Sequence, residues 1–277
     1  ALAAHKLRAI LTLAGVTVGV FSIIVVMTAM RVLQRNVEGE LSQLGAHTFA
    51  IARWPAMRFE GPSGWEKYRR RKPLTLEQVL DLRERATLAR SVGAETWLNG
   101  SECSSRYAKT NPDVGMTGVT PEVFTAKNWV VREGRGLTET DMDSARHVCV
   151  LGNNLAKTLF PQGSPVGEEI KFAGVNYRVV GYLEPKGGMG GAGQDNFLAV
   201  PITTGLNRYG NPWRSLTLLI QARDATLFDD TVEQVRGALR TLRKVPPGAV
   251  DDFEIMSNDS LIEQFRSLTL AVRIGVA

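Results

Sequence analysis

The stretch VCVLGNNLAKTLFPQGSPVGEEIKFAGVNYRVVGYL, residues 148–183, predicts a strand, a helix and a hairpin in succession. Its first four residues are all apolar, which indicates a short buried strand. A helix is expected to begin at Asn153 and to end before Pro161, because proline lacks the N–H that a helix interior needs. Apolar and polar residues alternate on both sides of Ala173 and Gly174, which is typical of a β-hairpin. This stretch therefore indicates a mixed α+β fold.

Helices and strands alternate along the sequence on both sides of this stretch. Alternating apolar residues predict further strands over residues 47–53, 88–98, 103–110, 215–221 and 252–256. The apolar spacing of residues 228–242 predicts a helix that ends before Pro246. Because the two ends of this region alternate helix with strand while its middle is richer in strands, we expect one subdomain to be inserted into another.

The beginning of one helix is marked clearly in the sequence. Thr75 and Gln78 have the spacing of a capping box, in which each side chain accepts a hydrogen bond from the other residue's backbone. Leu74 and Val79 have the spacing of a hydrophobic staple across the same helix start. The buried face of this helix is predicted to consist of Leu76, Val79 and Leu80.

Residues 10–30 contain no charged side chain and predict a membrane helix. At about 1.5 Å per residue, a helix of this length spans about 30 Å of hydrocarbon. The alternatives are a cleaved signal peptide, whose apolar core is shorter, and a buried core helix. Lys6 and Arg8 on one flank match Arg31 and Arg35 on the other, so the positive-inside rule leaves the orientation open.

Two apolar stripes flank the region between residues 47 and 257. Each repeats at spacings of three and four residues and therefore predicts an amphipathic helix, one that leaves the membrane and one that returns to it. Together they indicate a helical stalk, although each also fits a face that packs on the folded domain. The stripes consist of Leu33, Val37, Leu41 and Leu44 and of Leu261, Phe265 and Leu268, with Val272 continuing the second.

The two ends of the sequence suggest a longer natural protein. The chain begins at Ala1 rather than at a methionine, and its last residues, 268–277, are mostly apolar. That final run is too short to cross a bilayer. We therefore expect it to be the beginning of a second membrane helix.

Composition excludes some classes of partner. The 33 basic and 28 acidic residues give a net charge of +5, which is too small and too evenly spread to indicate nucleic-acid binding. Only two cysteines, Cys103 and Cys149, are present, and they form neither a disulfide framework nor a CxxC motif. Cys149 lies within an apolar run and is expected to be a buried thiol. The redox compartment stays open.

A search for chemistry finds no catalytic, cofactor-binding or metal-binding motif. The glycine-rich residues 186–193 are not followed by the Lys-Ser/Thr pair of a phosphate loop and are expected to form a flexible loop. Glu139, Asp141 and Asp143 lack the glycine and closing glutamate of a calcium loop, so Thr138 and Asp141 fit a helix cap better. The three histidines have no partners at ligand spacing. We therefore expect the chain not to be an enzyme.

A basic run, RRRK at residues 69–72, follows a segment rich in Pro, Gly and charged residues. Such a run is usually a solvated loop, which is the structure we expect here. The alternative is a patch that binds lipid headgroups.

Several motifs resemble those of the MacB/FtsX-type ABC-transporter permeases. The resemblance covers nearly the whole chain, and the middle third carries most of its specificity. It rests on HKLRAILT at 5–12 with Gly15 and Gly19, on Leu44 and Gly45, on GVTPEVF at 118–124, on EGR at 133–135, on VLG at 150–152 with Leu155, Ala156, Leu159 and Phe160, on PVG at 165–167 with Glu168 and Ile170, on YRVVG at 177–181, and on DNFLAVP at 195–201. The basic segment of residues 65–72 departs from the family pattern.

This resemblance implies an α+β extracytoplasmic domain on transmembrane helices with helical stalks. The domain would consist of a porter-like part of βαβ units and an inserted, strand-rich part called Sabre-like. By residue number, the implied parts are 1–31 for the first membrane helix with its cytoplasmic flank, 32–46 for the stalk, 47–110 and 200–257 for the porter-like part, 111–199 for the inserted part, 258–267 for the returning stalk, and 268–277 for the start of the second membrane helix.

The resemblance also implies a function in the cell inner membrane, with the N terminus in the cytoplasm. The chain would be a multi-pass permease subunit that transmits ATP-driven motion of a partner ATPase to the extracytoplasmic domain, in efflux, lipoprotein release or a similar process. Implied partners are an ABC ATP-binding subunit, a second permease copy in a homodimer or heterodimer, a periplasmic adaptor protein and the lipid bilayer. The alternatives are a membrane-anchored sensor or regulatory domain and an FtsX-like activator of a cell-wall hydrolase.

Overall fold

A computed structural model describes residues 10–22, 24, 25, 28, 32, 47–55, 68–98, 100–186, 195–211 and 213–257. The chain divides into two compact units, Gln43–Asn258 and a second one made of Ala1–Ser42 with Asp259–Ala277. In the second unit, residues 10–22 are helical and their large apolar side chains are exposed. Over the stretches that the structure describes, no helix is both long and apolar enough to cross a membrane. The predicted membrane helix includes residues outside those stretches and stays a prediction.

Four strands of the first unit form an antiparallel sheet in the order β11-β1-β10-β2, with each strand antiparallel to its neighbours. The strands are β1 (Thr48–Ala52), β2 (Ala89–Trp97), β10 (Thr217–Ala222) and β11 (Glu254–Met256). The connection from β1 to β2 contains α3 (Leu76–Arg85), and that from β10 to β11 contains α8 (Phe228–Leu242). This is a split β-α-β arrangement, and we call these elements the four-stranded part.

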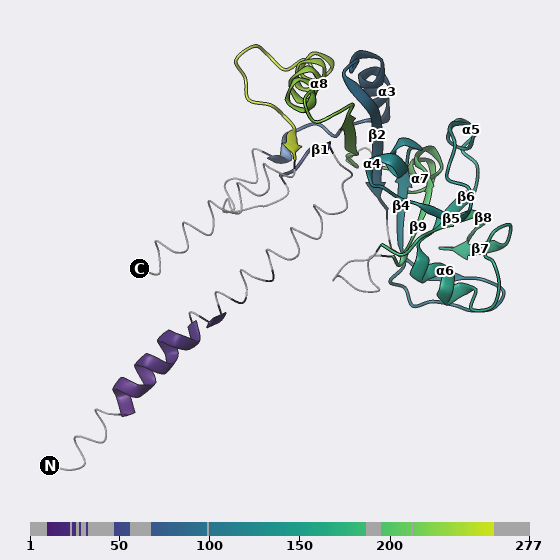
Figure 1. The fold of residues 1–277 in the computed structure, drawn as a ribbon, viewed down its shortest axis with the longest axis horizontal. Helices are drawn as coiled ribbons and strands as arrows, with labels where there is room; N and C mark the ends of the chain where they lie inside the picture. The colour runs from purple at the N-terminus through teal and green to yellow at the C-terminus, as the bar shows by residue number, and fades with distance from the viewer. Residues whose placement is uncertain are drawn as a thin grey trace. The chain divides into compact units, whose positions relative to one another are not determined.

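The residues between β2 and β10, 98–216, form the rest of the unit, and we call them the intervening segment. The sheet continues from β2 through β4, β9, β6, β8, β7 and β3, and β5 pairs with β8. Its elements are β3 (Cys103–Ser104), β4 (Gly115–Val119), α4 (Glu122–Ala126), β5 (Val131–Gly134), α5 (Glu139–Asp143), β6 (Val148–Leu151), α6 (Asn153–Leu159), β7 (Glu169–Phe172), β8 (Val175–Leu183), β9 (Phe197–Pro201) and α7 (Ile202–Tyr209). Figure 1 shows α3 and α8 near β1 and β2, and α6 near β8 and β7. The boundaries predicted for an inserted part, 111 and 199, stay a prediction.

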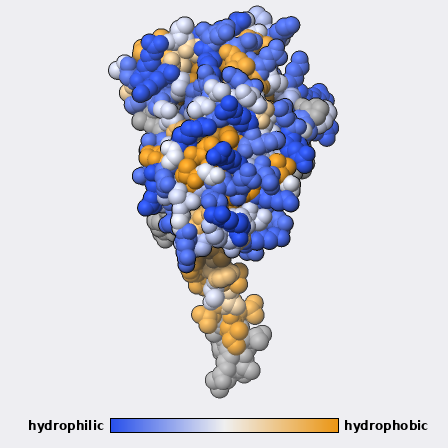
Figure 2. All heavy atoms as spheres, turned by 90° about the vertical axis from the view of Figure 1, so that its right-hand side faces the viewer, coloured by the Kyte–Doolittle hydropathy of each residue, from blue (hydrophilic) through white to orange (hydrophobic). Residues whose placement is uncertain are grey.

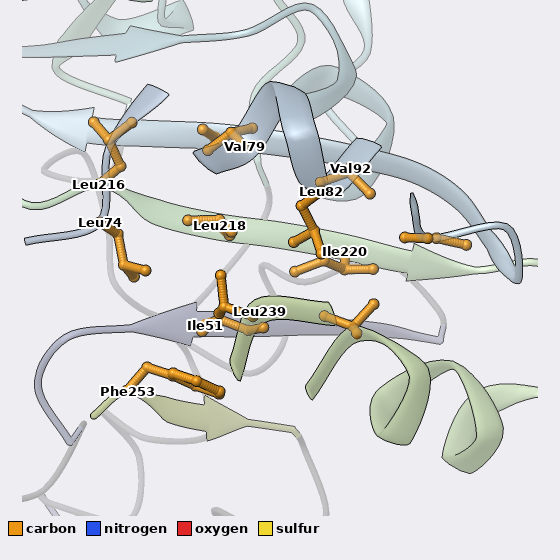
Figure 3. Packing of buried hydrophobic residues seen from close by; sticks show 14 of the residues in the cluster. Ile51, Leu74, Val79, Leu82, Val92, Leu216, Leu218, Ile220, Leu239 and Phe253 are labelled. Carbon is orange, nitrogen blue, oxygen red and sulfur yellow. The ribbon is translucent and has the colours of Figure 1, made fainter. Parts of the chain in front are cut away.

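Apolar side chains from α3 and α8 cover one face of the four-stranded part. Val79 and Leu82 of α3 and Leu239 of α8 pack on Ile51 and Leu218 of the sheet, as Figure 3 shows. A second cluster surrounds α6 in the intervening segment, and a third lies under α4 and joins β10 to β9 and β6. Burying such side chains stabilises a fold by about 1.5–3 kcal/mol each. On the unit Gln43–Asn258, Figure 2 shows apolar residues in small groups between hydrophilic ones.

Several predicted elements are confirmed. The hairpin consists of β7 and β8, and the residues of its turn, Ala173 and Gly174, have φ values of 47° and 84°. Positive φ at both positions fits the tight turn that follows the twist of a hairpin. Thr75 and Gln78 form the capping box, and the helix predicted over residues 228–242 is α8. Leu74 and Val79 are both buried in one cluster, as a hydrophobic staple requires.

Other local predictions are wrong. In α3 the buried residues are Val79 and Leu82, whereas Leu80 is exposed. Val79, Leu82 and the partly buried Leu76 belong to the cluster with the sheet and α8, and Leu80 lies outside this cluster. Of the strand predicted over residues 103–110, only Cys103–Ser104 is a strand. The chain then turns back, and the backbone N–H of Thr110 donates to the carbonyl of Cys103 at 2.8 Å. The hydroxyl of Ser105, which accepts from Tyr107 N and Ala108 N, stabilises this turn.

Asp141 forms the predicted helix cap and is also the buried centre of a group of ion pairs and hydrogen bonds. Its side chain is inaccessible to solvent, accepts hydrogen bonds from Thr138 and from two nitrogens of Arg135, and lies 3.5 Å from Arg146. Burial by itself raises the pKa of Asp141, but the hydrogen bonds from Arg135 and Thr138 and the charge of Arg135 outweigh it and lower the pKa to about 2. The carboxylate therefore stays ionised in the folded protein at any ordinary pH.

We expect Asp141 to make the stability pH-dependent in acid. Because its folded pKa lies below the ordinary value of about 3.9, its contribution is present above about pH 4 and is lost as the pH falls toward about 2. Solvent screens the half-exposed arginines, so the contribution at neutral pH is on the order of 1 kcal/mol. Urea unfolding of the parent and of Asp141→Asn from pH 6 to pH 2 measures it. The difference in unfolding free energy between the two proteins should shrink in acid. Asp143→Asn, at an exposed position of the same helix, is the control.

Candidate functional site

The chain comes into the folded unit and leaves it at one end of the sheet. β1 follows the first predicted stalk, and β11 precedes the second. The two strands are antiparallel neighbours, with Ala50 opposite Met256, Ile51 opposite Ile255 and Ala52 opposite Glu254. The start of β1 and the end of β11 therefore lie side by side, and we call this the proximal end. Any movement of the two flanking segments acts on two strands that are hydrogen-bonded to each other.

Aromatic and basic residues gather at the opposite end of the four-stranded part, at the ends of β1 and β2 and before β10. We call Arg53, Trp54, Trp97, Trp213 and Arg214 the distal rim. Arg53 lies over the Trp54 ring at 4.8 Å and donates to the carbonyl of Trp213 at 3.4 Å, and Arg214 donates to the carbonyl of Trp97. Trp213 is 77% exposed and Trp97 is 54% exposed. Arg53 is buried and Arg214 is half-buried, so the exposed groups of this rim are its tryptophans. Tryptophan is among the residues most enriched at the energetic centres of protein–protein interfaces, so this rim is a candidate docking surface.

Two buried arginines hold the strand ends behind the distal rim. Arg71 pairs with Glu254 of β11 at 2.8 Å and donates to the carbonyl of Arg53 at 3.0 Å. Arg243, at the end of α8, binds both carboxylate oxygens of Asp252 at 2.7 and 2.6 Å and also donates to Gln78 of α3 at 3.1 Å. A guanidinium group suits this role because its five donors have a fixed fork geometry. The two arginines therefore tie β1, α3, α8 and β11 together.

The solvated basic loop is predicted correctly at three positions and wrongly at one. Arg69, Arg70 and Lys72 are exposed, whereas Arg71 is buried. The sequence gives no sign of this difference, because the partner of Arg71 is Glu254, on a strand far along the chain.

A buried ion pair joins the four-stranded part to the intervening segment. Nζ of Lys127, just after α4, lies 2.7 Å from Oε2 of Glu95 on β2, and the two side chains are only 8% and 9% exposed. Lys127 also lies over the Trp129 ring at 5.6 Å. Burial lowers the pKa of nearby Lys186 to about 8, with the charge of Lys127 adding to the effect and the carboxylates of Glu95 and Asp195 opposing it. Sequence reasoning missed this pair, since neither residue belongs to a motif.

Among the described residues, the cysteines and acidic groups do not form a recognisable reactive centre. Cys103 and Cys149 are free thiols in one apolar cluster. Burial raises the pKa of Cys103 to about 12 and that of Cys149 well above its usual value, so neither is ionised at neutral pH. Within the described residues, no three His, Cys, Asp or Glu side chains are grouped to hold a metal ion. The charged groups brought together here are paired with one another, an arrangement that ties elements together.

Two sets of predicted residues lie outside the described part of the chain. One is most of the glycine-rich segment, residues 187–194. The other is the set of stalk and interface residues, namely Leu33, Val37, Leu41, Leu44, Leu261, Phe265 and Leu268. Their roles stay predictions.

Comparison with solved structures shows a shared fold. The periplasmic region of MacB from Actinobacillus actinomycetemcomitans superposes with a TM-score of 0.64 at 20% sequence identity, covering 83% of this chain and 98% of that one. At this identity the likeness concerns the fold alone.

Comparison with curated proteins and family models shows relatedness in sequence. The macrolide export ATP-binding/permease protein MacB of Syntrophobacter fumaroxidans is 30% identical over 83% of this chain, and the pyoverdine export ATP-binding/permease protein PvdT of Pseudomonas syringae pv. tomato is 26% identical over 98%. The match covers 32% of the first relative and 39% of the second, so the chain spans about a third of their length. The model of the MacB-like periplasmic core domain matches residues 9–238. The chain therefore belongs to the family of proteins that carry the MacB-like periplasmic core domain.

Proposed function

We propose that this chain is part of a permease subunit of a MacB-type ABC transporter, and that it transmits ATP-driven motion across the membrane to its extracytoplasmic domain. Family membership supports the transporter class. The names of the relatives pair an ATP-binding part with a permease, which supports a partner ATPase, fused or separate. The proposed location is the cell inner membrane, with residues 10–30 as the first of several membrane helices.

The proximal end is the observation that carries this proposal. Because β1 and β11 are hydrogen-bonded neighbours, two stalks joined to them would pull on a single corner of the sheet. β1 also pairs with β10, and β10 with β2, so a displacement of that corner is passed along the four-stranded part.

Two further partners belong to this proposal. We propose that a second permease copy completes the stalk through Leu33, Val37, Leu41, Leu44, Leu261, Phe265 and Leu268. We propose also that the distal rim docks a periplasmic adaptor protein, because it combines two exposed tryptophans with arginine at the end of the sheet away from the proximal end. Efflux is then the variant of the function that fits best.

A flexible insertion at the proximal end tests force transmission. We expect six Gly/Ser residues placed between Ser257 and Asn258 to slacken the returning stalk and to reduce coupled export by at least about tenfold, since a flexible linker of this kind behaves as a random coil. ATP hydrolysis by the partner should persist. Export by the full complex is measured in cells, and ATP hydrolysis by the full complex is measured in nanodiscs.

The matched control is the same insertion after Gly248, in the exposed loop between α8 and β11. Gly248 has a φ of 76° and open space around it, so the loop should accept the insertion without loss of export. Full export with the insertion at residue 257 would contradict the proposal and favour a merely anchored domain.

A further inference from the structure

We propose that the short helix α4 sets the position of the intervening segment on the four-stranded part, and that Arg83 of α3 is the positioning residue that holds it. Arg83 binds Oε1 of Glu122, the first residue of α4, at 2.8 Å, and Oε1 of Glu139, the first residue of α5, at 3.0 Å. One side chain of the four-stranded part thus holds two helices of the intervening segment. The inference rests on the proposed function only where it concerns export.

The sheet by itself is a weak link between the two parts. β2 and β4 are the neighbours that join them. Their register covers three residue pairs, Glu95 with Val119, Thr96 with Gly118 and Trp97 with Thr117, and one more backbone hydrogen bond runs from Leu98 N–H to the Met116 carbonyl at 2.8 Å. By comparison, the register of β10 on β2 extends over six residue pairs. Rotation about so short a pairing needs other contacts to restrain it, and the contacts of α4 are placed to do so.

α4 is fixed to the four-stranded part at both of its ends. Before its first turn, the backbone N–H of Thr120 donates to the carbonyl of Ala94 at 2.9 Å, and the backbone N–H of Ala94 donates to the Thr120 hydroxyl at 3.1 Å. A Cβ added to Gly93 would lie 3.2 Å from Glu122 Cβ, so the helix rests directly on β2. At its other end, Lys127 forms the buried pair with Glu95.

The other side of α4 packs on the intervening segment. The Phe124 ring contacts Trp129 edge-on at 5.5 Å, and Trp129 contacts Phe197 of β9 at 5.1 Å. Val123 and Ala126 are buried in the cluster that joins side chains of β6, β8 and β9 to Ala50 of β1 and Leu219 of β10. α4 therefore contacts both parts: polar contacts and shared apolar packing hold it to the four-stranded part, and aromatic and aliphatic packing holds it to the intervening segment.

Among the contacts that link the two parts, those of Arg83 are suited to a test. It is partly exposed, so its removal should leave the protein folded, whereas Glu95 and Lys127 are buried and their single variants are expected to lower stability. Arg83→Gln removes the positive charge that pairs with the carboxylates of Glu122 and Glu139. The triple variant Arg83→Glu with Glu122→Arg and Glu139→Arg restores both ion pairs with reversed sign. Arg106→Gln is the matched control, because Arg106 binds Glu168 at the same 2.8 Å but both residues belong to the intervening segment.

The first readout is the distance between two spin labels in the full chain in nanodiscs. The labels are attached to Val250→Cys, an exposed position between α8 and β11, and to Lys171→Cys, an exposed position on β7. Cys103 and Cys149 are buried and should not react. We expect the distance distribution to broaden or shift in Arg83→Gln, to return in the charge-swapped variant, and to stay unchanged in Arg106→Gln.

The second readout is coupled export by the full complex. A contact that positions a coupling element typically alters coupling by about 2- to 30-fold, and Arg83→Gln should lower export within that range while the charge swap restores it. A distance distribution that is the same in Arg83→Gln as in the parent would overturn the inference, whatever export does. A distribution that changes and is rescued supports it even if the insertion after Ser257 leaves export intact, in which case only the proposed function fails.

Discussion

Replacing Lys127 by methionine is expected to lower the free energy of unfolding by about 3 kcal/mol, because it leaves the carboxylate of Glu95 buried without its partner. Breaking a buried ion pair from one side typically costs about 3–5 kcal/mol. We expect the lower end of this range, since Lys186 is close enough to Glu95 to interact with its charge. Urea unfolding of residues 43–258 at pH 7 measures the change.

The double variant Glu95→Gln with Lys127→Met is the control for this prediction. It removes both charges and should recover much of the lost stability, because a neutral pair has no ion to desolvate. Glu95→Gln alone should cost about as much as Lys127→Met. A loss below about 1 kcal/mol in both single variants would show that water or another cation reaches the site, and would contradict the description of the pair as buried.

Replacing Val37 or Phe265 by aspartate is expected to abolish coupled export if the two apolar stripes form the proposed stalk. A carboxylate in the apolar seam between helices is buried without a partner, at a cost of several kcal/mol. The folded unit has its own core, so its melting temperature should not change. ATP hydrolysis by the partner should persist but lose its coupling to the extracytoplasmic domain.

The measurement for this second prediction is paired. Thermal melting of the folded unit with its flanking segments is followed beside export by the full complex, for each variant. Normal export with aspartate at both positions would rule out the stalk. A lowered melting temperature would instead show that the stripes pack on the domain, which is the other interpretation of their spacing.

Local structure was predictable wherever the physical cause is local. The capping box of Thr75 and Gln78 depends on residues three positions apart, and the hairpin turn depends on two neighbouring residues that accept positive φ. α8 follows from its apolar period alone. The motifs of the middle third also led to the family that the comparisons confirm.

Elements whose residues depend on distant partners were not predictable. β4, β5 and β9 carry no clear alternation, because β4 and β9 are covered on both faces and β5 is a short edge strand with mostly exposed side chains. α7 begins directly at the end of β9, without a side-chain cap that would mark it. Tertiary packing stabilises these elements, and a short stretch of sequence carries no information about that packing.

The sequence by itself determined the mixed α and β composition, the caps and turns, and the family, since these depend on residue types at short spacings. Only the tertiary structure decided which charges are buried. Arg71 differs from its basic neighbours because Glu254 meets it from β11, and Lys127 is buried because Glu95 meets it from β2. Likewise, only strand pairing placed Ala50 opposite Met256 and so brought the two ends of the folded unit together. Arg71 and Lys127 are stable in the interior because their partners arrive from far along the sequence, and folding alone brings each pair together.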